Sequence, residues 1–171
     1  MLLVGTHELV IDNKGRVSVP FAIRGKLNPD TDGRSFYVLP GKRQGTLAIY
    51  PDKYFEKLTE HAAPAGPISD ETYEWRQFEG SQTVLLDPDA QGRILIPERL
   101  LKRAGIAREA VLIGVQDHME LWNPHEFAAF EEAKWPDYPS QRAKAAKELY
   151  ERGASQLPPA APQRVPSNQA Q

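Results

Sequence analysis

The chain has 171 residues, 40% hydrophobic and 26% charged, a composition typical of a globular protein rather than a disordered or fibrous one. It has no cysteine, which excludes disulfides, thiolate metal sites and cysteine nucleophiles, and its net charge of −2 is not that of a uniformly basic nucleic-acid-binding protein. Its apolar runs are too short for a membrane span and no secretory signal is evident, so we expect a cytoplasmic protein with no membrane partner.

Three predicted elements open the chain, namely a strand, a tight turn and a returning strand, at residues 8–11, 13–15 and 17–19. Gly15 permits the positive φ that a tight reversal requires. Pro20 suits the first position of a short helix because proline has no amide hydrogen to leave unpaired there. Asn28 and Pro29 end that helix.

A second pair of strands is predicted at residues 35–39 and 46–50, followed by helices at 51–61 and 70–78. The segment 62–67, rich in proline and glycine, separates the two helices. From Asp52 to Glu79 this connector carries seven acidic and three basic side chains. The near-neutral total charge therefore conceals a segregated pattern.

The chain contains one sequence motif twice. Residues 12–20 align with 89–97 at a constant offset of 77, matching Asp, Gly, Arg and Pro, and residues 47–51 resemble 119–123 at an offset of 72. A long period with only two copies indicates duplicated modules rather than a solenoid. We place the boundary between them near Gly80.

The second copy repeats the order of the first. We expect strands, a turn and a short helix, then two strands and two longer helices, at 83–86, 90–92, 94–96, 97–104, 110–115, 119–122, 124–134 and 140–152. Gly92 corresponds to Gly15, and Gly105 and Gly153 end helices. The organisation predicted is a first module with connector helices (1–80), a second module with C-terminal helices (81–153) and a disordered Pro-rich tail (154–171) in a mainly β, α+β protein.

An aspartate before each glycine turn and an arginine after it can meet across the turn. The pairs are Asp12 with Arg16 and Asp89 with Arg93, and a charge-assisted hydrogen bond would orient each guanidinium. An oriented guanidinium suits phosphate oxygens or the guanine O6 and N7 acceptors. The alternative is an ordinary structural ion pair, but repetition within two basic segments favours contact with double-stranded DNA.

The two turns differ in charge, since Lys14 has Gln91 as its counterpart, and we therefore expect Arg16 to be the dominant contact. Basic side chains of the two short helices are secondary candidates for phosphate contacts: Arg24, Lys26, Arg99, Lys102 and Arg103. Several aromatic residues are predicted to pack rather than to bind: Trp75, Phe78, Trp122, Trp135 and Tyr150.

Catalytic function is not expected. The four histidines form no metal-binding pattern, and no phosphate loop, nucleophile elbow or dinucleotide fingerprint is present, so no metal, cofactor or small-molecule substrate is predicted. A hydrolase that uses Asp12 and Asp89 as a carboxylate pair is the enzymatic alternative. The arginine beside each carboxylate argues against a shared proton.

The residues that surround the two turns resemble the MraZ family of transcriptional regulators. The resemblance runs from about residue 4 to residue 135 and is carried by Gly5-Thr6, by 11–20 with Arg24, and by 86–97, 104–105, 111–114 and 119–122. It is specific because the Asp-x-x-x-Arg motif occurs twice in the expected context.

This resemblance implies two tandem AbrB-like swapped-hairpin β-barrel modules related by a pseudo-twofold axis, with Asp12, Arg16, Asp89 and Arg93 as site residues. It implies a nucleoid-associated homo-oligomer, in the form of a ring, that binds short direct repeats upstream of the division and cell-wall operon and represses that operon. A ring would compensate for the low charge of one chain by multivalency. The alternative is a protein-interaction regulator resembling AbrB-type antitoxins, with acidic helices or a tail that bind a partner protein.

Overall fold

The computed structural model describes residues 1–64 and 66–156. Its strands are β1 (Thr6–Val10), β2 (Arg16–Ser18), β3 (Phe36–Pro40), β4 (Thr46–Pro51), β5 (Val84–Leu86), β6 (Arg93–Leu95), β7 (Glu109–Gly114) and β8 (Met119–Trp122). Its helices are α1 (Phe21–Arg24), α2 (Asp52–His61), α3 (Asp70–Gln82), α4 (Glu98–Arg103), α5 (Pro124–Lys134) and α6 (Tyr138–Gln156). The prediction of a mixed α+β protein with antiparallel strands is confirmed.

The two halves of the sequence interleave their strands. One six-stranded sheet has the order β1-β7-β8-β4-β3-β5, so β1 of the first half pairs with β7 of the second, and β5 of the second half pairs with β3 of the first. At the centre, β4 pairs with β8. The order reads the same from either end when each strand is replaced by its counterpart, as a duplicated sequence with exchanged strands requires.

Residue 80, the predicted limit between the modules, lies inside α3. The chain divides instead into a compact unit from Met1 to Phe130 and a second unit that begins at Glu131. The two sequence modules are therefore not spatially separate, because each completes the sheet of the other. Their assignment as AbrB-like modules stays a prediction.

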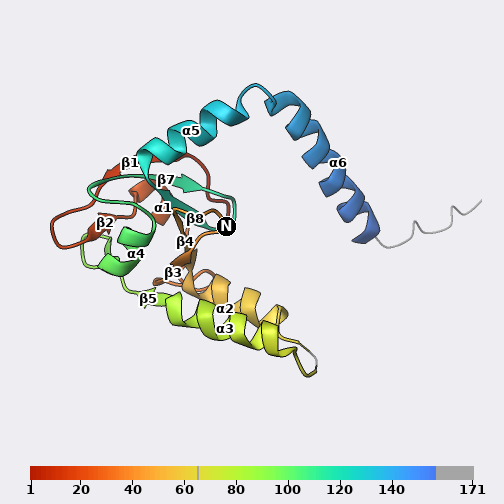
Figure 1. The fold of residues 1–171 in the computed structure, drawn as a ribbon, viewed down its shortest axis with the longest axis horizontal. Helices are drawn as coiled ribbons and strands as arrows, with labels where there is room; N and C mark the ends of the chain where they lie inside the picture. The colour runs from red at the N-terminus through yellow and green to blue at the C-terminus, as the bar shows by residue number, and fades with distance from the viewer. Residues whose placement is uncertain (65, 157–171) are drawn as a thin grey trace, which may run out of the picture. The chain divides into compact units, whose positions relative to one another are not determined.

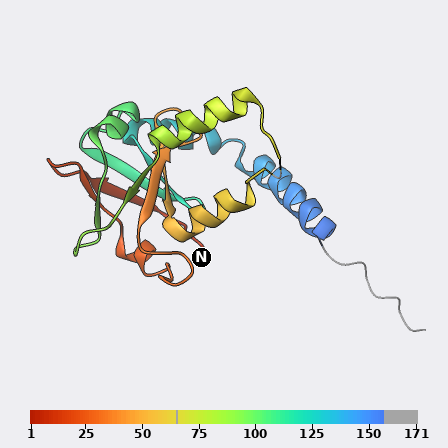
Figure 2. The same ribbon diagram turned by 90° about the horizontal axis from the view of Figure 1, so that it is seen from below.

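The strand that returns from each turn does not pair with the strand before it. Instead, β2 and β6 pair with each other in a separate antiparallel ribbon, with Val17 opposite Ile94. In Figure 1, β2 and α4 lie at the left of the view, while α2 and α3 extend from the sheet at the lower right. Figure 2, seen from below, again shows α2 and α3 extending away from the strands.

One hydrophobic core joins both halves beneath the ribbon. Val17 and Ile94 are buried together with Ile23 of α1 and with Leu100 and Leu101 of α4. The predicted docking of both short helices on the strands is thus confirmed. This shared core fixes the ribbon, and with it both turns, relative to the sheet.

Several predicted helix ends need correction. α1 stops at Arg24, four residues before Asn28, and Pro20 and Pro97 precede the first helical residues of α1 and α4 rather than occupying them. α3 continues to Gln82, beyond the predicted end at 78. α6 extends past Gly153 to Gln156, since one glycine weakens a helix without ending it. The remainder of the predicted tail, residues 157–171, lies outside the described residues.

Of the aromatic residues predicted to pack, Trp122 is buried, at 4% exposed, and contacts Phe127 and Phe130. Four others are more than 45% exposed: Trp75, Phe78, Trp135 and Tyr150. Apolar spacing along a helix therefore did not predict burial here, and α3 and α6 have no buried side chain among those described. None of the described helices is both long and apolar enough to span a bilayer.

Candidate nucleic-acid interface

The first turn is closed by its own aspartate. One carboxylate oxygen of Asp12 accepts hydrogen bonds from the backbone amides of Lys14 (2.9 Å) and Arg16 (3.0 Å). The other accepts from the Arg16 guanidinium, with Nε at 2.7 Å and Nη2 at 2.6 Å. Gly15 has a φ of +83°, as the turn prediction requires. The aspartate therefore shapes the backbone and holds the guanidinium in one orientation.

The second turn has the same geometry. Asp89 accepts from the amides of Gln91 (2.9 Å) and Arg93 (3.0 Å) and from Nε and Nη2 of Arg93 at 2.8 and 2.7 Å. Gly92 has a φ of +75°. Matching backbone hydrogen bonds and Asp–Arg contacts at both copies confirm that each Asp-x-x-x-Arg motif forms one structural unit. These pairs are about one-third exposed, so their charges remain accessible to a ligand.

Both carboxylates stay ionised over a wide pH range. Hydrogen bonding from the Arg16 side chain, aided by the backbone amides, lowers the pKa of Asp12 to about 2, and Arg93 has the same effect on the pKa of Asp89. A carboxylate that is charged at neutral pH can orient a cation but has no proton to donate. The chemistry of these aspartates thus favours the positioning role over the hydrolytic alternative.

The β2–β6 ribbon presents both arginines on one face. Val17 and Ile94 point inward and are buried, so the alternation along each strand turns Arg16 and Ser18 outward, together with Arg93 and Leu95 of the neighbouring strand. Arg16 lies opposite Leu95, and Ser18 lies opposite Arg93. The two guanidinium groups therefore stand at the two ends of one short, exposed face.

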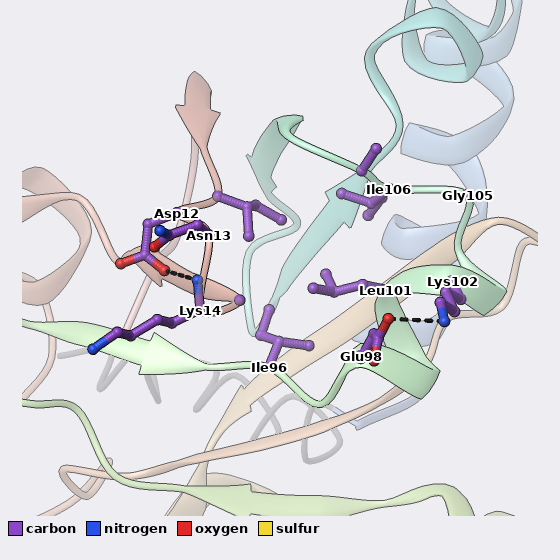
Figure 3. A pocket seen from close by; sticks show the side chains of 12 residues that line it. Asp12, Asn13, Lys14, Ile96, Glu98, Leu101, Lys102, Gly105 and Ile106 are labelled. Carbon is purple, nitrogen blue, oxygen red and sulfur yellow. Dashed lines mark hydrogen bonds and ion pairs between the residues drawn. The ribbon is translucent and has the colours of Figure 1, made fainter.

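Each turn is bound to the other half of the chain. Ile96 donates its amide hydrogen to the Gly15 carbonyl (3.1 Å), and Val19 donates to the Gly92 carbonyl (3.0 Å). Each turn consequently faces the short helix of the opposite half, across a hollow of roughly 600 Å³. Figure 3 shows the hollow at the first turn, with Asp12 and Lys14 on one side and Leu101 and α4 on the other.

The side chain that faces each turn from the opposite helix is different. At the second turn it is Arg24, whose Nε donates to the Val19 carbonyl (2.9 Å) and whose guanidinium lies over Gly92. A Cβ on Gly92 would lie 2.5 Å from the Arg24 Cζ. At the first turn the corresponding residue is Leu101, 3.9 Å from the position of a Cβ on Gly15. Sequence reasoning named Arg24 but did not assign it to the second turn, since the exchange of helices is a tertiary feature.

Four further sequence candidates lie in four different settings. Lys14 is exposed at the tip of the first turn, and Lys26 is exposed beside the N-terminal residues. Arg99 donates to the Gln82 side chain (3.2 Å) and to the Ser81 carbonyl (3.4 Å), so it binds the end of α3. Lys102 pairs with Glu98 at 2.8 Å. Of these, Lys14 is the one that belongs to a turn.

Sequence reasoning found no metal-binding pattern among the histidines and missed a network around His118. Its Nδ1 lies 2.7 Å from Asp117, which also accepts a hydrogen bond from Tyr54 (2.9 Å), and its ring stacks on Tyr50 at 4.5 Å. Burial lowers the pKa of His118, but the contacts with Glu120 and Asp117 outweigh burial and raise it. The sequence around residue 118 did not predict the contact with Tyr54, because Tyr54 lies in α2, far away along the chain.

His118 and Glu120 also line a cavity of about 760 Å³ between the sheet and helices α2 and α3. Within the described ranges 1–64 and 66–156, no three His, Asp or Glu residues gather so that they could hold a metal ion. The Asp117–His118–Glu120 contacts are therefore read as a hydrogen-bonded network rather than a metal centre.

Comparison with known proteins identifies the family. Residues 80–149 match the family described as "MraZ protein, putative antitoxin-like". The chain is 29% identical to "Transcriptional regulator MraZ" of Thermomicrobium roseum over 139 residues, covering 81% of this chain and 94% of that protein. It is 32% identical to the protein of the same name from Polaromonas sp. over 127 residues, covering 74% and 86% of the two chains. With the Mycoplasma mobile protein of that name, identity is 27% over 89% of this chain and 99% of the relative. The chain belongs to the MraZ family.

Proposed function

We propose that this protein is a non-enzymatic transcriptional regulator that binds double-stranded DNA in a sequence-specific manner through its two Asp-x-x-x-Arg turns. The observation that carries the proposal is the exposed face of the β2–β6 ribbon, which holds Arg16 and Arg93 in fixed orientations. Guanidinium groups held in this way lose little entropy when they contact phosphate or a guanine edge. The names of the relatives support a role in transcription.

Charge distribution supports the same assignment. The segment from Asp12 to Leu27 has four basic and one acidic side chains, and the segment from Asp89 to Arg103 has four basic and two acidic ones. The acidic surplus lies in α2 and α3, which extend from the sheet in both ribbon views. The DNA-binding face is therefore basic although the chain as a whole is not.

The proposed target is a set of short direct repeats upstream of the division and cell-wall operon that contains the protein's own gene, with repression as the outcome. A single ribbon offers few cations, so we propose a homo-oligomeric ring that aligns several ribbons on the repeats. Linking weak contacts in this way raises affinity by multivalency. The protein would then act in the cytoplasm on nucleoid DNA.

A gel-shift titration on DNA from upstream of the protein's own gene tests this proposal. Arg16→Ala and Arg93→Ala should each weaken binding by about ten- to a hundredfold, because each removes an oriented guanidinium. Arg76→Ala, which removes one exposed charge from α3, is the matched control and should leave affinity unchanged. Wild-type affinity should fall steeply with salt, and equal binding by all four proteins would overturn the proposal.

The family description favours one further candidate function, that of an antitoxin-like regulator of a partner protein. The acidic helices α2 and α3 would be the surface for a basic partner. Co-purification of one stoichiometric partner, together with no salt-sensitive affinity for the promoter DNA, would support this candidate and contradict the first.

A further inference from the structure

The two turns are built to the same plan but carry different cations. The tip of the first turn has Lys14 where the second has Gln91, and the helix residue facing the first turn is Leu101 where the second turn faces Arg24. Besides its own arginine, the first turn therefore has a cation at its tip, Lys14, and the second has one over its glycine, Arg24. At the first turn that cation is local in sequence, and at the second it comes from the opposite half of the chain.

The additional cations also differ in mobility. Arg24 is partly buried and is held by the bond from its Nε to the Val19 carbonyl, while its guanidinium rests on the backbone of Gly92. Within residues 1–64 and 66–156, the Nη groups of Arg24 donate no hydrogen bond to a protein acceptor, and neither does the exposed ammonium of Lys14. One cation is a fixed fork over Gly92, and the other is a flexible point charge.

These two arrangements recognise oxyanions differently. A guanidinium held in one place offers a planar fork of donors to phosphate oxygens with defined geometry, whereas an ammonium on a flexible chain attracts phosphate without fixing its direction. Gly92 permits this arrangement, since a Cβ there would occupy the space of the Arg24 guanidinium. Gly15 does not have this role, because a Cβ there would meet the Ile96 carbonyl and the apolar side chains of Leu95 and Leu101 rather than a cation.

We propose that Arg24 completes the second turn from the opposite half of the chain, so that the second turn binds the DNA backbone through Arg93 together with the fixed Arg24, and the first through Arg16 and Lys14. This inference rests on the proposed DNA-binding function and deepens it. It reverses the expectation that the first turn dominates, since the charge lost at Gln91 is restored by Arg24.

The difference gives each chain a direction on DNA. Two turns related by an exact twofold axis would recognise an inverted repeat, since symmetric readers match symmetric sites. The exchanges at Lys14/Gln91 and Arg24/Leu101 remove that equivalence, and the ribbon then distinguishes its two ends. A chain with unequal ends suits direct repeats, in which every copy of the site has the same orientation.

The test compares Arg24→Gln with Lys14→Gln, which remove one charge from the second and first turns respectively. Both are titrated on the promoter fragment across a salt series, and phosphate-ethylation interference maps the contacts on each strand. Each variant should bind about tenfold more weakly, with a salt slope lower by about one. The phosphates that stop interfering should lie at opposite ends of the repeat. Arg24→Lys should restore the salt slope while failing to restore the full affinity, because lysine lacks the fork.

Three results would overturn the inference while leaving the proposed function intact. Arg24→Gln could bind with wild-type affinity while Arg16→Ala does not, or both glutamine variants could lose the same phosphates. Absence of binding by the wild-type protein would instead refute the proposed function itself. Thermal melting of each variant shows whether loss of the Arg24–Val19 bond unfolds the ribbon. If Arg24→Gln is destabilised and Arg24→Lys recovers both the fold and the full affinity, Arg24 has a structural role and the proposal is contradicted.

Discussion

The first and second turns have matching backbone hydrogen bonds, a glycine with positive φ and an Asp–Arg ion pair, yet their surroundings differ. Asp12 and Asp89 each accept four contacts of nearly equal length. The helix that covers each turn supplies an arginine in one case and a leucine in the other. The two copies thus share the residues that form the turn, but they differ in the side chain that the covering helix presents beside it.

The core beneath the ribbon offers the largest expected difference between the halves. Ile94 and Val17 are counterparts that are 0% and 2% exposed. Ile94→Ala should lower the free energy of unfolding by about 2–5 kcal/mol, and Val17→Ala by roughly 1 kcal/mol less, because valine has one methylene fewer. Denaturant unfolding measures both, with Ser18→Ala on the exposed face as the control. Equal losses would mean that the two sides of the ribbon are packed differently from what the structure shows.

The turn glycines come next in size. Gly15→Ala and Gly92→Ala each place a Cβ on a residue with positive φ, which costs about 1–2 kcal/mol. Gly92→Ala must also displace the Arg24 guanidinium, so it should reduce DNA affinity more than Gly15→Ala at a similar loss of stability. Parallel melting curves and gel shifts separate the two effects. If Gly15→Ala weakens DNA binding equally, Arg24 has no special part at the second turn.

Acid should affect both turns alike. The pKa of Asp12 and that of Asp89 are about 2 in the folded protein against an ordinary value of 3.8. A lowered folded pKa stabilises the protein above the ordinary value, and this contribution is lost as the pH falls from about 4 towards 2. Asp12→Asn and Asp89→Asn should each flatten the acid limb of the stability curve by the same amount. Unequal flattening would show that the carboxylates, and not only the added cations, distinguish the turns.

The smallest effect is expected at His118, which has no titratable counterpart in the β3–β4 hairpin. Its pKa is raised from the ordinary value of 6.5, so its stabilising contribution is present below that value and is lost as the pH rises through the folded pKa. His118→Asn should therefore lower the melting temperature more at pH 5.5 than at pH 8.5. The exposed His125→Asn serves as control. A change in melting temperature that is the same at both pH values in His118→Asn would contradict the stabilising ionisation assigned to His118.

The site was largely predictable because its chemistry is local. An aspartate, a positive-φ glycine and an arginine within five residues define the turn by their own hydrogen bonds, and the duplicated motif marked both copies. The helix α5 matched its predicted limits because Asn123 and Pro124 signal its start. Arg99 was less predictable, since its partners at Ser81 and Gln82 lie in another element.

The sequence by itself determined the repeat, the turns, the segregated charge and the family, since each depends on residues close together in the chain. Tertiary structure decided which elements of the two halves lie together: β2 pairs with β6, β1 pairs with β7, and α1 covers the second turn. Strand exchange leaves the apolar pattern of every strand unchanged, so hydrophobic periodicity is the same whether a strand pairs within its own copy or with the other. The partner is selected instead by the single core that both copies fill together, and this selection places Arg24 over Gly92 of the second turn.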